Sequence, residues 1–517
     1  MKTDVLIVGA GPTGLALACQ LIRYGVDFMI IDKKESITSF SKAIGVQART
    51  LELYEQIGLA APLIAEGLPL KGVRMIEGGE VRAEIPLSEL GKGVSPYSFM
   101  LIVEQGIHEK LLYAFINDHN KDVRWETTLA DFSQNDAGVS GTLTSAGGES
   151  QSIEAKYLVA CDGARSTVRS ALSLTFEGST FERMFYVADV QVTWDFPHDM
   201  LMACLARNRS VAFFPMLGQD RYRIVGVFPE DFEKEPNDVV YDEIERQAIE
   251  DSQLNLDIYK VNWFSTYKVH SRRVNKFSEG RCFLAGDAAH IHTPAGGQGM
   301  NTGIQDGYNL AWKLALVLRG EAKAELLTTY NEERIVVAER LLETTDRMFD
   351  LLVNPARLLA FIRTRIFPHI ANLALSFDAV KQFVFPLISQ TGINYHDSSL
   401  SSSDDNFEIK AGERMPYFLI DGKSVYDWLH SPAFHLLVFS DAQTDNRTII
   451  NQIQLEYGGL VECASLPLHP RAAEVFGTKR PFCVLLRPDN YISLISSGNI
   501  SDAVRDYFEN VIGRRTN

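Results

Sequence analysis

A glycine-rich segment near the N-terminus limits the folds open to this chain more than any other feature. The apolar run Val5 to Val8 predicts a short strand buried on both faces, and GAGPTG, with Gly9, Gly11 and Gly14, follows it directly. In such a pattern the glycines allow a tight turn, close approach of the backbone to a pyrophosphate, and close packing of the next helix. A helix that starts at this turn would direct its free amides toward the phosphates. The segment therefore predicts a dinucleotide site.

A second strand, Phe28 to Ile31, ends at Asp32, which lies 23 residues beyond Gly9. A carboxylate at about this distance binds the ribose of a dinucleotide. Asp32 argues against a 2′-phosphate, whereas Lys33 and Lys34 weaken that argument. A structural glycine turn is the alternative for GAGPTG alone. The ordered strand, turn, helix, strand and acid favour dinucleotide binding and leave the dinucleotide open.

The composition narrows the class of protein. The chain has 517 residues, enough for several domains, and a net charge of −16, which argues against a nucleic-acid surface. The six cysteines are scattered, with no CxxC pair and no histidine cluster at metal spacing. We therefore expect reduced thiols and no metal site.

The predicted first strand begins close to Met1, so we expect no signal peptide and a cytoplasmic protein. No uninterrupted apolar run approaches the ~20 residues that span a bilayer. The best candidate, Leu358 to Phe377, contains Arg363, Arg365 and Pro368. We interpret it as an amphipathic helix packed within the protein rather than a membrane contact.

Alternation of apolar and polar positions predicts several domains. The strand Arg281 to Ala285 leads into glycines again, so the chain returns to the nucleotide domain after a middle block of strands. The segment His396 to Asp405 has the composition of a linker. The predicted parts are a nucleotide domain (1–180 and 268–345), a middle β-sheet domain (181–267, with contributions from 68–102), a helical connector (346–395) and a C-terminal α/β domain (406–517).

Two further segments carry chemistry. Asp162 and Gly163 follow the predicted strand Ala155 to Ala160 and precede a capped helix start, although a surface turn explains them equally well. In the second segment, a strand delivers Gly286 and Asp287 to a turn, where the carboxylate is able to bind the hydroxyls of a cofactor.

The glycines between Pro294 and Gly299 allow the backbone to approach a flat ring. A helix beginning near Met300 and Asn301 would aim its free amides at that ring and stabilise negative charge on a reduced isoalloxazine. A purely structural loop is the alternative, and the first glycine motif favours cofactor contact.

GAGPTG with Asp32, YLVACDGARSTVR and LAGDAAHIHTPAGGQGMNTGIQDGYNLAWKLA together resemble the three fingerprints of the single-component FAD-dependent aromatic hydroxylases, of the p-hydroxybenzoate and phenol hydroxylase type. The resemblance implies an α/β fold, with a Rossmann-type FAD-binding domain, an inserted β-sheet substrate domain and a helical connector. GERMPYF and LLRPDNYISL resemble the thioredoxin-like C-terminal domain of the larger members. This chain lacks the redox CxxC there, which implies a structural or dimer-stabilising role.

The resemblance also implies which residues contact FAD. They are Gly9, Gly11, Pro12, Thr13, Gly14, Asp32 and Lys33 at the ADP part, Lys42 and Gln105 beside the flavin and its tail, Asp162 and Gly163 at the border of FAD and NAD(P)H, Gly286 and Asp287 at the ribityl chain, and Pro294, Gly297, Gly299, Met300 and Asn301 at the ring. Lys42 stands where many relatives carry an arginine, so it keeps the charge but loses the planar fork. Arg49 is another candidate, and a helix-surface arginine is the alternative.

In such enzymes NADPH or NADH reduces FAD, which reacts with O₂ to give a C4a-hydroperoxide that hydroxylates an electron-rich ring. The resemblance therefore implies no catalytic side-chain nucleophile. Strand alternation suggests substrate walls, with ordinary sheet packing as the alternative for each residue: Tyr186, Asp189, Gln191, Phe213, Met216 and Arg223. Arg221 is a candidate to attract the reduced flavin or the nicotinamide phosphate. For His290 and His292 we expect structural hydrogen bonds rather than catalysis.

Three other functions are alternatives to aromatic hydroxylation. A flavin halogenase would carry a WxWxIP stretch, which this sequence lacks, and a membrane-bound quinone-pathway hydroxylase would need an anchor. A non-catalytic FAD-binding protein, serving redox sensing or interaction, is the third. A phenol, a polycyclic polyketide or an antibiotic such as a rifamycin or tetracycline would fit as substrate, and the resemblance makes a homodimer a reasonable expectation.

Overall fold

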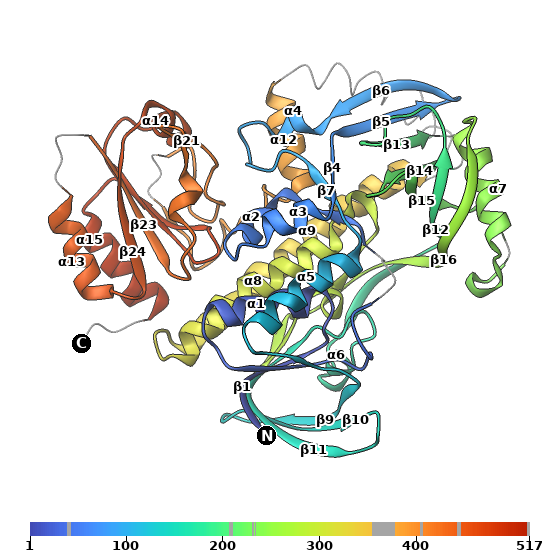
Figure 1. The fold of residues 1–517 in the computed structure, drawn as a ribbon. Coiled ribbons are helices and arrows are strands. Elements are labelled where there is room, and N and C mark those ends of the chain that lie inside the picture. The colour runs from blue at the N-terminus through green and yellow to red at the C-terminus, as the bar shows by residue number, and fades with distance from the viewer. Residues whose placement is uncertain are drawn as a thin grey trace.

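The computed structural model describes residues 1–38, 43–205, 210–229, 232, 234–353, 378–403, 407–441 and 446–513. Three sheets and the long helix α8 (Gly299–Leu318) organise this part of the chain (Figure 1). The predicted helix over Leu358 to Phe377 lies outside the described residues. Among the residues described, no helix is long and apolar enough to cross a membrane.

The first sheet is built around β1, whose apolar residues are buried because neighbouring strands and helices cover both faces. Strand β1 runs parallel to β11 on one side and to β2 on the other, and β11 runs parallel to β18. A hairpin of β9 and β10 extends from β11. In order across the sheet, the strands are β17 (Ser278–Glu279), β18 (Cys282–Leu284), β11 (Ser150–Ala160), β1 (Lys2–Val8), β2 (Phe28–Ile31) and β8 (Val123–Arg124), with β10 (Val139–Ser145) and β9 (Thr127–Gln134) off this path.

Helix α8 is the central helix of the structure. It is buried along nearly its whole length, and its buried residues include polar as well as apolar side chains. Helix α1 (Pro12–Arg23) packs against both α8 and α5 (Gln105–Asp118). The other described helices are α2 (Ala48–Glu55), α3 (Ala60–Ala65), α4 (Leu87–Gly91), α6 (Thr167–Ala171), α7 (Tyr241–Ser252), α9 (Thr328–Val353), α12 (Asp378–Ser389), α13 (Arg447–Tyr457), α14 (Pro470–Phe476) and α15 (Ile500–Asp506).

The second sheet contains the long antiparallel strands β12 and β16, and helix α7 covers its outer face (Figure 1). Strand β5 joins this sheet by pairing in parallel with β13, and β6 pairs antiparallel with β5. In order across the sheet, the strands are β19 (His290–Ile291), β16 (Asp257–Val274), β12 (Phe176–Thr193), β15 (Arg221–Val227), β14 (Ser210–Pro215), β13 (Met200–Leu205), β5 (Gly72–Glu77) and β6 (Glu80–Pro86). A small separate sheet has the order β3 (Gly45–Val46), β7 (Met100–Ile102) and β4 (Leu68–Leu70).

The third sheet belongs to the C-terminal part. Its strands β23 and β24 are parallel, and the hairpin β25–β26 adds antiparallel to β23. The order is β20 (Ser402–Ser403), β26 (Ile492–Ser496), β25 (Phe482–Leu486), β23 (Phe434–Ser440) and β24 (Val461–Pro467), beside a short hairpin of β21 (Leu419–Ile420) and β22 (Lys423–Ser424). The rings of Phe434 and Trp312 lie 5.8 Å apart, so this sheet shares a core with α8.

The α/β fold class predicted from the sequence is confirmed, with a parallel nucleotide-type sheet and a second sheet formed by the middle of the chain. The thioredoxin-like assignment of the C-terminal part and the residue bounds of the domains stay predictions.

Candidate functional site

The first glycine motif forms a tight turn between β1 and α1. Gly9 has a φ of +108°, and a Cβ there would lie 2.3 Å from the carbonyl oxygen of Cys161. A Cβ at Gly14 would lie 1.9 Å from the carbonyl oxygen of Gly9. A Cβ at Gly11, however, would meet no atom of the described residues within 4 Å. Gly9 and Gly14 therefore serve close packing, and Gly11 borders open space.

The same turn begins helix α1. Gly11 is its N-cap, Pro12 is its first residue, and no described side chain caps its amides. Unsatisfied amides and the helix dipole make this end a site for an anion such as a phosphate.

Asp32 lies beside this turn. Its Oδ2 accepts a hydrogen bond from the backbone amide of Ala10 at 2.7 Å, and its Oδ1 accepts one from the backbone amide of Lys34 at 2.9 Å. The Lys34 Nζ lies 3.8 Å from Asp32 Oδ2, whereas the Lys33 side chain is exposed. The basic side chain beside Asp32 is therefore that of Lys34. The FAD contact predicted for Lys33 stays a prediction.

The second motif follows β11 directly. Asp162 Oδ2 accepts a hydrogen bond from the backbone amide of Thr167 at 2.8 Å, whereas its Oδ1 is buried without a hydrogen-bond partner among the described residues. Gly163 has a φ of +81° and borders open space. Arg169 donates a hydrogen bond to the carbonyl oxygen of Ala288 at 2.9 Å, which ties this motif to the third.

The third motif packs against the first. A Cβ at Gly286 would lie 2.5 Å from Thr13 Oγ1, and one at Gly303 would lie 2.9 Å from Gly286 Cα. This close packing leaves Asp287 as an exposed residue between buried Gly286 and Ala288. The predicted contact of its carboxylate with the polyol hydroxyls of a cofactor stays a prediction.

The glycine loop before α8 is open to solvent. Pro294 and Gly297 are exposed, and Gly297 has a φ of +62° with open space around its Cβ position. Helix α8 begins at Gly299, where no described side chain caps its amides. Met300 is half-buried in the first turn. The backbone of this loop is therefore accessible to a planar ligand.

The side chain of Asn301 holds the loop before α8, whereas the sequence predicts that the backbone amides near Asn301 face the ring. Its Oδ1 accepts hydrogen bonds from the backbone amide of Gln47 at 2.9 Å and from Thr50 Oγ1 at 2.8 Å. Its Nδ2 donates to the carbonyl oxygens of Gly45 at 2.9 Å and Gly297 at 3.0 Å. The side chain fixes the loop, so only the backbone of Asn301 is left to contact a cofactor.

Gln105 begins α5 and holds the loop after Asp32. Its Oε1 accepts a hydrogen bond from the backbone amide of Ala43 at 3.2 Å, and its Nε2 donates to Glu109 at 2.8 Å. Glu109 also accepts a hydrogen bond from the backbone amide of Thr38 at 3.2 Å. Lys42 lies outside the described residues, and its contact stays a prediction.

Arg49 is not the helix-surface arginine of the alternative. It is buried, and it donates hydrogen bonds to Glu52 at 3.1 Å and to the carbonyl oxygen of Asp489 at 2.7 Å. The guanidinium therefore joins α2 to the C-terminal part. A lone arginine in the sequence gave no sign of that distant partner.

The predicted substrate residues divide between the two faces of the second sheet. Tyr186 and Phe213 lie in the apolar core together with Ile244 of α7. Asp189 and Arg223 lie on the opposite face, because side chains alternate along a strand. Tyr186 and Phe213 were therefore wrong choices for pocket walls, since they pack under α7.

The face that carries Arg223 turns toward the glycine loop before α8. Phe214 pairs with Arg223 on the neighbouring strand and shares an apolar cluster with Met100. The sulfur of Met100 would lie 3.2 Å from a Cβ at Gly45, whose carbonyl oxygen is bonded to Asn301. The sheet and the loop thus meet through Met100.

Arg223 and Asp189 form a buried ion pair on this face. Arg223 Nε and Nη2 donate to the two carboxylate oxygens at 2.6 and 2.7 Å. Arg223 Nη1 is buried and has no hydrogen-bond partner among the described residues. The guanidinium lies 5.6 Å from the centre of the Trp263 ring. A buried donor without a partner is costly, which favours a ligand oxygen as its partner.

The remaining predicted residues of this region lie at the seam between the sheet and α5. Gln191 is half-buried and pairs in register with Arg221. Arg221 binds both carboxylate oxygens of Glu104 at 3.2 Å, so it already has an anionic partner. Met216 is buried and lines a small cavity with Val103 and Glu104.

The two histidines of the third motif are buried or half-buried. His290 Nε2 lies 2.8 Å from Asp306 Oδ2, in the expected structural hydrogen bond. His292 Nδ1 lies 2.7 Å from the carbonyl oxygen of Thr293. Burial, together with the nearby His290, lowers the pKa of His292 to about 4, so the imidazole is neutral at pH 7.

The three motifs converge at one edge of the first sheet. Gly9, Asp32, Cys161 and Ala285 come directly after the carboxyl ends of β1, β2, β11 and β18, which are parallel neighbours. Ligands of open α/β sheets bind at this edge. The open space beside Gly11, the two uncapped helix ends and the exposed Asp287 fit a long phosphate-containing cofactor with a polyol and a ring. This geometry defines a dinucleotide-binding protein of the flavoprotein class.

Comparisons with known proteins give the family. Residues 2–345 match the FAD binding domain family. A flavin-dependent monooxygenase of Mycobacteroides abscessus is 32% identical over 98% of this chain and 100% of its own length. Pentachlorophenol 4-monooxygenase of Sphingobium chlorophenolicum is 32% identical over 80% of this chain and 75% of its own length. The solved OxyS anhydrotetracycline hydroxylase from Streptomyces rimosus has a TM-score of 0.77 and 28% identity, covering 99% of each chain. This chain belongs to the FAD-binding flavin-dependent monooxygenases, and FAD is its cofactor.

Sequence reasoning missed several residues that shape the site. Asp306 holds the Gly286 turn, Gln47 donates to the carbonyl oxygen of Gly296 at 2.8 Å, and Gln390 donates to Thr302 of α8 at 2.8 Å. Asp306 is the only acidic residue of α8, which was the available signal. The glutamines gave no comparable signal, because their partners are distant in the sequence.

Proposed function

We propose that this protein uses NADPH or NADH and O₂ to hydroxylate an aromatic substrate, phenolic or polycyclic, beside its bound FAD. The observation that carries the proposal is the position of Arg223. This buried donor lies on the sheet face that turns toward the glycine loop before α8, and its Nη1 has no partner among the described residues.

In this proposal each motif binds one part of FAD. The turn at Gly9 to Gly14 and the α1 amides bind the pyrophosphate, Asp32 the ribose, and Asp287 the ribityl hydroxyls. The backbone from Pro294 to Asn301 borders the ring. When bound, FAD supplies the redox and oxygen chemistry, and the protein supplies orientation and a dry pocket.

The substrate would lie between the glycine loop and the inner face of the second sheet. Its walls would include Asp189, Gln191, Met216 and Arg223, without Tyr186 and Phe213. Asp189 neutralises the charge of Arg223, so the free Nη1 suits a phenol or carbonyl oxygen better than a carboxylate. The dissimilar substrates named for pentachlorophenol 4-monooxygenase and the anhydrotetracycline hydroxylase support an aromatic class and leave its size open.

The test is NADPH and NADH oxidation by the FAD-loaded protein in air, with a panel of phenols, benzoates and polycyclic quinones. We expect one aromatic to accelerate oxidation and to gain one oxygen atom by mass spectrometry. An inert panel with a flavin that neither nucleotide reduces would support the non-catalytic FAD-binding alternative. The homodimer and the cytoplasmic location stay predictions, and size-exclusion chromatography with light scattering would test the first.

A further inference from the structure

Asp306 is the buried residue that fixes the turn presenting Asp287. Its Oδ2 accepts a hydrogen bond from the backbone amide of Gly286 at 2.8 Å and lies 2.8 Å from His290 Nε2. The first contact is made one residue before Asp287. Asp306 lies on α8 and is fully buried, so its side chain touches no cofactor itself. Its contacts are those of a positioning residue.

Arg334 of α9 holds the other oxygen of Asp306. Arg334 Nε donates to Asp306 Oδ1 at 2.6 Å, and its Nη2 donates to the carbonyl oxygen of Thr302 at 3.2 Å. Burial by itself raises the pKa of Asp306, but Arg334 and His290 outweigh that effect and lower the pKa. The carboxylate is therefore charged and available to both partners.

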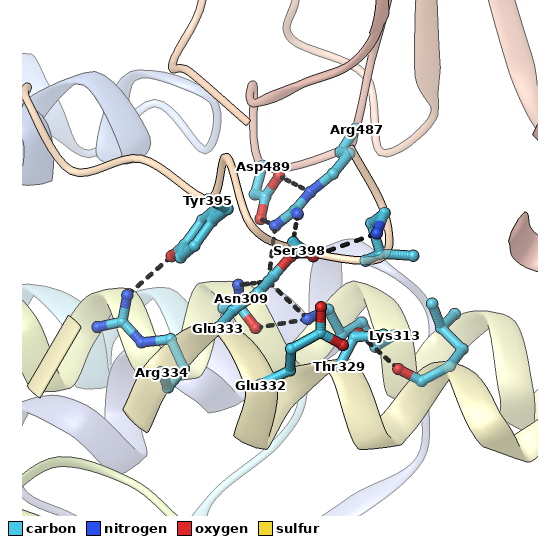
Figure 2. Close-up of polar contacts among 12 residues, drawn as sticks. Asn309, Lys313, Thr329, Glu332, Glu333, Arg334, Tyr395, Ser398, Arg487 and Asp489 are labelled. Carbon is cyan, nitrogen blue, oxygen red and sulfur yellow. Dashed lines mark hydrogen bonds and ion pairs between the residues drawn. The ribbon is translucent and has the colours of Figure 1, made fainter. Parts of the chain in front are cut away.

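Arg334 is in turn fixed by Tyr395, which lies in the segment before the C-terminal sheet. Arg334 Nη1 donates to the Tyr395 hydroxyl at 2.8 Å (Figure 2). The Tyr395 ring lies 4.5 Å from the ring of Tyr491 and 5.0 Å from the Arg487 guanidinium, both in the C-terminal part. The Tyr395 backbone amide donates to the carbonyl oxygen of Gly412 at 2.7 Å. The tyrosine is thus held by the C-terminal part on several sides.

We propose that the C-terminal part positions the ribityl-binding turn of the FAD site through the buried contacts Tyr395–Arg334–Asp306–Gly286. The C-terminal part then serves as a clamp on cofactor affinity rather than as a separate redox unit. A charge-assisted hydrogen bond joins Arg334 to Asp306 in this series, and its geometry tolerates little displacement of either residue. A change at Tyr395 therefore reaches Gly286 without any contact between Tyr395 and FAD. The inference rests on the proposed position of FAD beside Asp287.

The test compares two matched substitutions, Tyr395→Phe and Tyr507→Phe. Both remove one buried hydroxyl, and Tyr507 donates to the carbonyl oxygen of Leu400 at 3.2 Å, away from Arg334. The readouts are the Kd of FAD for the apoprotein, the visible circular dichroism of saturated protein, and the Tm of the apoprotein. Substitutions along such a series change the coupling enough to alter Kd by roughly twofold to thirtyfold.

We expect Tyr395→Phe to raise the Kd of FAD by at least about threefold and to alter the flavin dichroism. Tyr507→Phe should lower Tm by a similar amount but keep the Kd and the dichroism close to those of wild type. Equal changes in Kd for both variants, or none for Tyr395→Phe, would overturn the inference. Asp287→Ala separates the two proposals. An unchanged Kd in Asp287→Ala would overturn the FAD position itself, whereas a raised Kd in Asp287→Ala with normal Tyr395→Phe would overturn the clamp alone.

Discussion

Arg223 and Asp189 face each other directly across β15 and β12, and the guanidinium binds both carboxylate oxygens at 2.6 and 2.7 Å. Both side chains are buried on the sheet face toward the glycine loop. A buried ion pair contributes little net stability compared with an apolar pair, yet removal of one partner leaves a costly charge. The pair therefore serves to fix Nη1 as a donor.

We expect Asp189→Leu to lower the free energy of unfolding by about 3–5 kcal/mol, because it leaves Arg223 buried and unpaired. The double variant Asp189→Leu with Arg223→Met should regain most of that loss in urea unfolding. Its KM for the aromatic substrate should rise at least about tenfold, since a lost hydrogen bond to a buried donor costs about 1.5–3 kcal/mol. A double variant with normal KM would show that Arg223 does not bind substrate.

Gly11 and Gly14 differ in what surrounds them, which gives a second prediction. Gly11→Ala should change the stability of the apoprotein by less than about 1 kcal/mol, because its φ of −83° suits alanine and the described residues leave space for the Cβ. Its FAD affinity should fall at least about tenfold, because that Cβ enters the space proposed for the pyrophosphate.

Gly14→Ala is the matched contrast. Its Cβ would lie 1.9 Å from the Gly9 carbonyl oxygen, so the apoprotein itself should lose about 2–3 kcal/mol. Thermal unfolding without FAD, followed by FAD titration, separates the two effects. Normal FAD binding by Gly11→Ala would contradict the proposed pyrophosphate site.

Stability should fall in mild acid because of His108. This imidazole is buried and lies 2.7 Å from the Tyr54 hydroxyl, and burial lowers its pKa to about 4. Between the pKa of an unfolded histidine, about 6.5, and that lowered value, the unfolded chain binds a proton that the folded chain does not. Folding therefore weakens as pH falls, by about 2 kcal/mol from this group between pH 7 and pH 5.

The measurement is urea unfolding of His108→Gln at both pH values. This variant should lose correspondingly less stability between pH 7 and pH 5 than wild type. His119→Gln is the control, because His119 is exposed. Equal pH dependence in His108→Gln and wild type would show that another group causes the acid sensitivity.

The sequence was most informative where function constrains local backbone. Gly9, Asp32 and Asp287 occupy the positions their motifs imply, because strand ends and turns depend on neighbouring residues. The choice of sheet face failed for Tyr186 and Phe213, because alternation shows which residues share a face but not which face helix α7 covers. The partner of Arg49 is 440 residues away, and no local pattern encodes such a contact.

Glu333 gives the last prediction, since it is the centre of a buried network between α8, α9 and the C-terminal part (Figure 2). Its Oε1 accepts from Arg487 at 2.5 Å and Ser398 at 2.7 Å, and its Oε2 accepts from Lys313 at 2.8 Å and Asn309 at 2.6 Å. Burial by itself raises the pKa of Glu333, but Arg487 and Lys313 hold it far below its usual range. The carboxylate is therefore charged at neutral pH.

Glu333→Gln removes the negative charge and replaces one acceptor oxygen by an NH2 group, which faces other hydrogen-bond donors. We therefore expect a loss of about 3–5 kcal/mol in the free energy of unfolding. Lys313→Met should cost less, about 1–2 kcal/mol, because Glu333 keeps Arg487 and Ser398 and the methionine fills the space. Burial already lowers the pKa of Lys313 to about 8, which makes its charge the less essential of the two. Urea unfolding of the FAD-loaded variants measures both values. Equal losses of unfolding free energy in Glu333→Gln and Lys313→Met would mean that Lys313 stabilises the protein through Glu333 as much as Arg487 does. The contact between Glu333 of α9 and Arg487 of the C-terminal part would then not be the main source of stability.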